Sequence, residues 1–119
     1  MAKITYPQNT ELSKEMQYRH LVARGESLKN LDDGTVIDIK SLVAYDSDDG
    51  VKVISILGNK WNAEKETFDS NITHYVSNSS IFRTELEKIV QIFGDTGIGI
   101  RIRKYESKGG RTYVTCELA

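Results

Sequence analysis

The end of the chain places cationic and aromatic side chains in one repeating pattern. Six of them fall in two expected strands and the loop between them: Arg101, Arg103, Tyr105, Lys108, Arg111 and Tyr113. Because successive side chains of a strand point to opposite faces, Arg101, Arg103 and Tyr105 share one face, and Tyr113 joins them if the strands pair. Cations contact phosphates and flat rings stack on any base, so this combination suits single-stranded nucleic acid. A solvated hairpin with ordinary surface tyrosines is the competing interpretation.

The other chemistry-bearing residues do not form a catalytic pattern. His20 and His74 stand far apart in the sequence, and neither has a neighbouring group of metal ligands. No nucleophile motif, zinc-ligand spacing or phosphate loop is present, and the Gly-Ile-Gly at 97–99 lacks the third glycine of a dinucleotide fingerprint. We therefore expect no enzymatic activity, no metal and no cofactor.

Size and charge indicate one small domain. The chain has 119 residues, with 16 basic and 17 acidic side chains and a formal net charge of −1. Nucleic-acid-binding domains are often basic overall, so a binding surface here depends on the local distribution of charge. Cys116 is the only cysteine, which predicts a buried free thiol. Without a membrane-spanning apolar run or a signal-peptide core, we expect a cytoplasmic protein that does not contact a membrane.

Five strands are expected around one helix. An Asp-Asp-Gly turn at 32–34 opens the first strand, which runs to Tyr45. The other strands are expected at residues 51–57, at 61–77 with an interruption at 69–71, at 98–105 and at 111–118. The Gly-Asn-Lys sequence at 58–60 predicts a turn between the second and third strands.

Alternation sets the expected faces of the first strand. Five residues should share one face: Ile37, Ile39, Ser41, Val43 and Tyr45. Leu42 and Ala44 are apolar on the opposite face. A bulge near Lys40 and Ser41 would supply the bend that a small coiled barrel needs. Tyr45 has two interpretations, an outward stacking ring or the last core residue of its strand.

A helix is the most clearly marked element. Residues 78–80, Asn-Ser-Ser, can cap its first turn, and Gly94 is placed to end it. Its apolar residues form a continuous stripe that we assign to the core: Phe82, Leu86, Ile89, Val90 and Phe93. A helix between strands three and four of five is the arrangement of the OB-fold, so we predict an all-β five-stranded Greek-key barrel with this one helix. Another small β-rich α+β barrel or sandwich is the alternative.

The N-terminal residues precede this pattern. We expect an N-terminal arm at residues 1–24 and the OB-fold domain at residues 25–119. Within the arm, residues 11–24 fit a weak helix, and residues 17–24 fit a strand equally well. The arm is a partly ordered extension in one interpretation. In the other it mediates homo-oligomerisation or adds an edge strand.

Several short segments match a known family. They are residues 29–31 (Lys-Asn-Leu), 33–37 (Asp-Gly-Thr-Val-Ile), Tyr45, 73–75 (Thr-His-Tyr) and 107–109 (Ser-Lys-Gly). Tyr75 also stands seven residues before the apolar start of the helix at Phe82. From Gly25 to Ala119, the chain resembles the single-stranded-DNA-binding proteins of small tailed phages that replicate linear genomes from a protein primer. The most specific part of the match is residues 30–37.

This resemblance implies a protein that binds single-stranded DNA without sequence preference. It would coat and protect displaced strands during phage or mobile-element replication in the host cytoplasm, beside replication proteins. The resemblance implies base-stacking roles for Tyr45 and Tyr75, the two tyrosines that match in spacing. The loop between the first two strands lacks the aromatic residue expected in the family, and Trp61 is a candidate to replace it. The alternative is a protein-binding barrel module, such as a phage inhibitor of a host factor, which fits the near-neutral charge.

Overall fold

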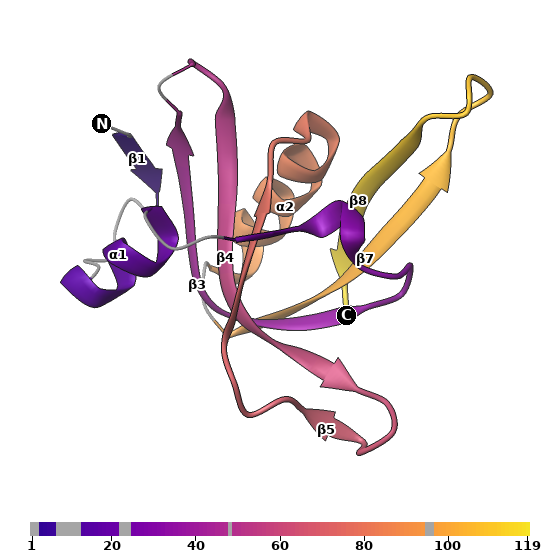
Figure 1. The fold of residues 1–119 in the computed structure, drawn as a ribbon, viewed down its shortest axis with the longest axis horizontal. Coiled ribbons are helices and arrows are strands. Elements are labelled where there is room, and N and C mark those ends of the chain that lie inside the picture. Colours follow the sequence, from indigo (N-terminus) through magenta and orange to yellow (C-terminus); the bar gives the residue numbers. More distant parts are fainter. Residues whose placement is uncertain (1–2, 7–12, 22–24, 48, 95–96) are drawn as a thin grey trace.

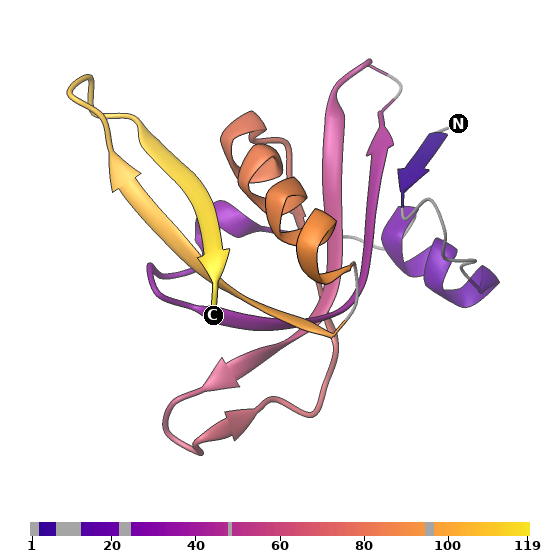
Figure 2. The same cartoon turned by 180° about the vertical axis from the view of Figure 1, so that it is seen from behind.

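The protein is a curled, open β-sheet with one main helix against it (Figures 1 and 2). The computed structural model describes residues 3–6, 13–21, 25–47, 49–94 and 97–119. In chain order the elements are β1 (Lys3–Tyr6), α1 (Lys14–Leu21), β2 (Glu26–Ser27), the 3-10 turn η1 (Leu28–Asn30), β3 (Val36–Asp46), β4 (Lys52–Asn62), β5 (Thr67–Phe68), β6 (Thr73–Ser77), α2 (Ser80–Phe93), β7 (Ile98–Glu106) and β8 (Thr112–Leu118). The prediction of a mostly β protein with one main helix is confirmed.

The strand order leaves the sheet open along one line. Hydrogen-bonded neighbours follow the order β2-β6-β4-β3-β7-β8, with β1 added to β3 and β5 added to β4. Among the described strands, β2 and β6 are parallel and every other pair is antiparallel. Among the described strands, none pairs with β8 on the side away from β7. The turn η1 packs against both β6 and β8 across this gap, which we call the seam. The sequence did not predict the short strand β2, whereas β5 lies within the segment expected to be a strand at 61–77 and β1 agrees with the edge-strand interpretation of the arm.

A bulge divides β3 into two halves: odd-numbered residues face the core before it, and even-numbered residues face the core after it. Ile39 pairs with Gly58 of β4 and Ser41 pairs with Leu57, so Lys40 is an extra residue, as predicted. Beyond the bulge the core side chains are Leu42 and Ala44. The predicted common face of Ile39 with Ser41 and Val43 is therefore wrong, because the extra residue inverts the alternation. Ser41 and Val43 are buried on the other side of the sheet, where the Ser41 hydroxyl contacts α1.

β4 continues through the segment that was expected to turn. Gly58 lies inside the strand opposite Ile39, and the chain instead reverses at residues 63–66. A Cβ on Gly58 would stand 2.6 Å from the backbone oxygen of Asp38 and 2.7 Å from Cγ2 of Ile37. Glycine is needed here because β3 approaches the β4 backbone closely, and the predicted turn at 58–60 is wrong.

The capped helix α2 covers the concave core. The Ser79 hydroxyl accepts a hydrogen bond from the Phe82 amide at 3.3 Å, and the Gly94 amide donates to the Val90 carbonyl at 2.8 Å. Phe82 is fully buried, as the apolar stripe predicted. Phe93 is 53% exposed, so its assignment to the core is wrong; the helix has passed the edge of the core there. Neither described helix is long and apolar enough to cross a lipid bilayer.

Residues 14–21 form the helix α1, so of the helix and the strand that fitted this part of the arm equally well the structure has the helix, docked on the outside of β3 and β4. His20 is 1% exposed and lies between two hydroxyls, with Nε2 and Nδ1 each 2.8 Å from Ser41 Oγ and Ser55 Oγ respectively. His74 Nε2 lies 2.6 Å from the same Ser55 Oγ. The two histidines and two serines thus form a polar network that holds α1 against the sheet. The division of the chain at residue 24 and the oligomerising role of the arm stay predictions.

Candidate nucleic-acid interface

The strands β7 and β8 place four of the predicted site residues on one surface. Their register pairs Tyr105 with Tyr113 and Arg101 with Glu117, so these side chains and Arg103 share what we call the outer β7–β8 face. The two tyrosine rings lie with centroids 6.1 Å apart at an interplanar angle of 39°. Tyr105 is 49% exposed, which leaves its ring available to a ligand. The alternation read from the sequence is thus confirmed, while the binding role stays a prediction.

The two arginines of this face form ion pairs with carboxylates. Arg103 Nε donates to Glu117 Oε1 at 2.7 Å, and Arg101 Nη1 lies 3.5 Å from the same oxygen. Arg103 Nη1 also lies 3.6 Å from Asp33 Oδ2. The hydrogen bond from Arg103 holds the pKa of Glu117 below its ordinary value. A phosphate on this face must therefore compete with carboxylates, although exposed ion pairs of this kind are weak.

A groove opens beside the same hairpin, at the seam. Its volume is about 590 Å³. It is lined by η1, the start of α2 and the start of β8 through Lys29, Ser79, Ser80, Ile81, Arg111, Thr112, Tyr113 and Val114. Arg111 therefore lies in this seam groove, and Lys108 lies exposed in the turn between β7 and β8. The sequence did not single out Lys29 or Ser80 for the site, because they lie about 80 and about 30 residues before Arg111 and meet it only in the fold.

Trp61 lies in a different part of the molecule. It packs edge-on against Phe68, with ring centroids 5.1 Å apart, in the hairpin formed by β4 and β5. The two rings are 39% and 37% exposed. This hairpin and the β7–β8 hairpin project from opposite ends of the sheet (Figures 1 and 2). Trp61 and the outer β7–β8 face are thus separate surfaces.

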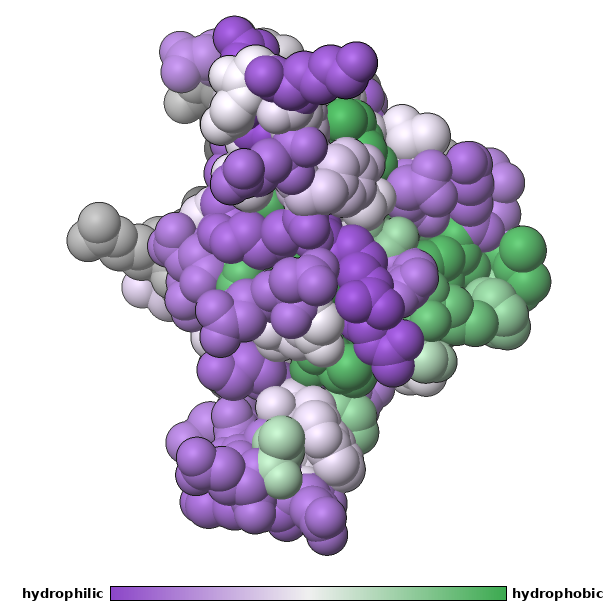
Figure 3. Space-filling view, turned by 90° about the vertical axis from the view of Figure 1, so that its right-hand side faces the viewer, coloured by the Kyte–Doolittle hydropathy of each residue, from purple (hydrophilic) through white to green (hydrophobic). Residues whose placement is uncertain are grey.

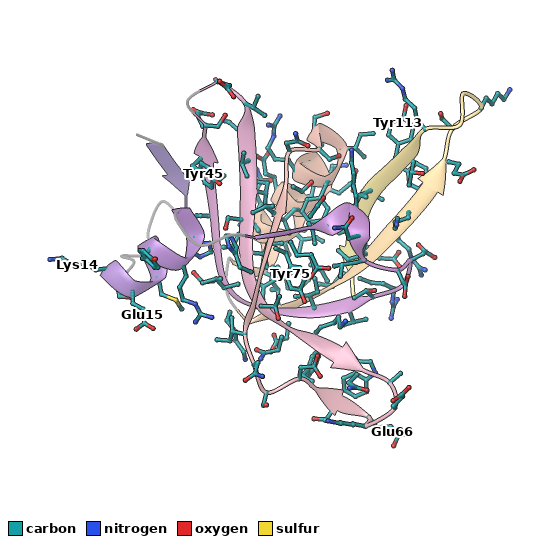
Figure 4. All side chains as sticks on the ribbon, in the orientation of Figure 1. Lys14, Glu15, Tyr45, Glu66, Tyr75 and Tyr113 are labelled. Atoms are coloured by element: carbon teal, nitrogen blue, oxygen red, sulfur yellow. The ribbon has the colours of Figure 1, made fainter. Side chains whose placement is uncertain are left out.

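The two tyrosines suggested by the family resemblance do not join this face either. Tyr75 is 2% exposed within the core, so its ring is not accessible to a base in this structure, and its stacking role stays a prediction. Tyr45 is half-buried on β3, where it pairs with Ile4 of β1 and Val53 of β4. Burial raises the pKa of both hydroxyls. Figure 4 shows Tyr45, Tyr75 and Tyr113 in three separate regions.

Comparison with known proteins gives no match. No family model, characterised protein or solved structure is similar to this chain. Among the described residues, no three His, Cys, Asp or Glu side chains are grouped so that they could hold a metal ion. The function is therefore inferred from the two neighbouring surfaces at the β7–β8 hairpin.

Proposed function

We propose that the protein is an OB-fold protein that binds single-stranded DNA without sequence preference and coats displaced strands during phage or mobile-element replication. The strand order β6-β4-β3-β7-β8 supports the fold assignment, because α2 follows β6 and precedes β7 as the helix of an OB-fold would. The short strands β1, β2 and β5 are then additions to a five-stranded Greek-key barrel that stays open at the seam.

The outer β7–β8 face is the observation that carries the proposal. Two neighbouring tyrosines offer flat rings, and two arginines stand on the same face within the same hairpin. Base stacking on such rings does not depend on base identity, because every base has a flat face. The arginines supply charge for the sugar-phosphate backbone. A surface of this composition favours an unpaired strand, since the bases of a duplex are stacked on one another.

The tyrosines should control affinity. Tyr105→Ala and Tyr113→Ala are each expected to weaken binding of oligothymidine by about 1–3 kcal/mol, a roughly five- to hundredfold loss, because each removes a stacking ring. Fluorescence anisotropy of a labelled oligothymidine measures this loss. Trp61→Ala is the control, and its affinity should stay unchanged because Trp61 belongs to the β4–β5 hairpin and not to the outer β7–β8 face. Normal affinity in both tyrosine variants would remove the outer β7–β8 face as the site.

Salt should weaken binding only moderately. For single strands, the logarithm of the binding constant falls with the logarithm of the salt concentration with a slope of about −0.7 for each phosphate neutralised. Because this surface has few cations without a carboxylate partner, we expect a slope on the order of −1 to −3. Titrations at several sodium chloride concentrations give this slope. Affinity independent of salt, or equal affinity for duplex DNA, would contradict the proposal.

An exposed apolar surface favours a second candidate, a protein-binding module. Ile92 is 75% exposed and Phe93 is 53% exposed at the end of α2. Figure 3 shows hydrophobic side chains gathered on one flank of the molecule, on the side where α2 faces outward. Contiguous apolar surface of this kind commonly contacts another protein. Wild-type protein that fails to bind oligothymidine would favour this candidate over DNA binding.

A further inference from the structure

We propose that the seam groove binds a phosphate group of a nucleotide. The inference rests on the proposed function in one respect: the groove would hold the backbone of the same strand whose bases stack on the outer β7–β8 face. Tyr113 links the two surfaces, because it pairs with Tyr105 on the outer face and also lines the groove. A strand leaving Tyr113 over the edge of β8 enters the groove directly.

The charge of the lining selects an anion. The chain has slightly more acidic than basic residues, 17 against 16, yet the eight lining residues include two cations and no carboxylate. In the part of the chain that the structure describes, neither Lys29 nor Arg111 forms an ion pair. These two cations therefore differ from Arg101 and Arg103, which already form ion pairs with a carboxylate. A phosphate entering the groove displaces no carboxylate.

Hydrogen bonds fix the backbone at the groove, where two hydroxyls are available as donors. The Lys29 amide donates to Ser27 Oγ at 3.3 Å, and Lys104 Nζ donates to the Lys29 carbonyl at 2.7 Å, which holds a third cation beside the groove. Ser79 is already engaged, since its hydroxyl donates to the Val114 carbonyl at 3.4 Å. Within the described residues the hydroxyls of Ser80 and Thr112 make no such contact, so both remain available to a phosphate oxygen.

The size of the groove agrees with this ligand. A volume of about 590 Å³ lies inside the usual range of small-molecule sites, on the order of 300–1,000 Å³. A phosphate with its sugar fits such a space. Ile81, 37% exposed, provides an apolar surface for the sugar.

The two groove cations can be tested against two matched cations elsewhere. The double variant K29A/R111A should weaken oligothymidine binding about tenfold or more and make the salt slope less negative by about 1.4, at roughly 0.7 for each lost phosphate contact. The control double variant K60A/K65A removes the same charge from the β4–β5 hairpin and its edge. The control should change the affinity by less than about twofold and leave the salt slope unchanged. Equal effects of the two variants would overturn the proposal, because only total charge would then matter.

Amide NMR spectra identify the phosphate without relying on strand binding. Ser80 and Thr112 amide signals of the ¹⁵N-labelled protein should shift with thymidine 5′-monophosphate but not with thymidine. An oligothymidine without terminal phosphates should shift them as well if the groove takes internal phosphodiesters. Shifts with the monophosphate alone would support a groove that binds terminal phosphates. If oligothymidine does not bind at all and the monophosphate still shifts these signals, the proposed function fails while the phosphate groove stands. If neither phosphate-bearing probe shifts them, the groove proposal is overturned.

Discussion

Replacing Tyr75 with alanine is expected to lower the free energy of unfolding by about 3–5 kcal/mol, as truncation of a buried aromatic ring does. Tyr75 is 2% exposed and belongs to the same core cluster as Leu28, Phe82 and Ile56, its pairing partner on β4. Removing the ring leaves a cavity between η1, α2 and the sheet that these rigid elements cannot fill. Urea denaturation followed by circular dichroism measures the difference.

Tyr113→Ala is the matched control for this loss. The same substitution on the outer β7–β8 face removes a partly exposed ring that lies beside Tyr105, so the free energy of unfolding should fall by less than about 1.5 kcal/mol. Tyr75→Ala with wild-type stability and reduced oligothymidine affinity would show that Tyr75 leaves the core to bind DNA. It would then restore the role implied by the family resemblance.

Acid is expected to destabilise the fold through His20. Burial, with the nearby His74 and Arg19 as smaller causes, lowers the pKa of His20 from 6.5 to about 4. Between pH 6.5 and about 4 the unfolded chain binds a proton that the folded protein excludes. The free energy of unfolding should therefore rise with pH across this window by up to about 1.4 kcal/mol per unit, roughly 3 kcal/mol in total.

The variant His20→Gln separates this effect from the titration of carboxylates. Glutamine can hydrogen-bond both Ser41 and Ser55 but does not titrate, so its stability should depend less steeply on pH between 4 and 6.5. Thermal melts at several pH values compare the two proteins. Parallel pH profiles would mean that His20 is protonated in the folded protein or that α1 leaves the sheet without cost.

Local signals predicted those parts of the fold that local chemistry determines. α2 begins and ends where its serine cap and Gly94 indicate, because capping depends on residues within one turn. The alternation of β7 likewise predicted its buried isoleucines and the outer face. Gly58 was misread because its role depends on the approach of β3, a contact that nothing in the neighbouring sequence marks.

Tyr75 shows why burial was harder to predict than strand position. Its strand β6 reads Thr-His-Tyr-Val-Ser, and the stacking role of Tyr75 was implied by the family resemblance alone. Both faces of β6 are in fact covered: Tyr75 points into the core while His74 joins the polar network under α1. Alternation alone cannot tell which face is inward when a second layer covers the outside.

The site was predictable only within one hairpin. The sequence places Tyr105 and Tyr113 together because their strands are neighbours in the chain. The carboxylate of Asp33 and the ammonium group of Lys29 come from about 70–80 residues earlier, and only the completed sheet brings them to the hairpin. The sequence therefore identified the rings but neither the partners of the arginines nor the groove.

The bulge at Lys40 lets β3 carry one residue more than the segment of β4 beside it. Lys40 is exposed, and its ammonium group lies 2.9 Å from the Asp38 carboxylate. Deleting Lys40 would join Ile39 directly to Ser41, which restores simple alternation and leaves Leu42 and Ala44 on the core side and Ser41 beneath His20. Loss of this one residue would therefore remove the bend of β3 but keep both packed layers. Loss of one residue farther along the strand, with the bulge kept, would instead exchange its two sides.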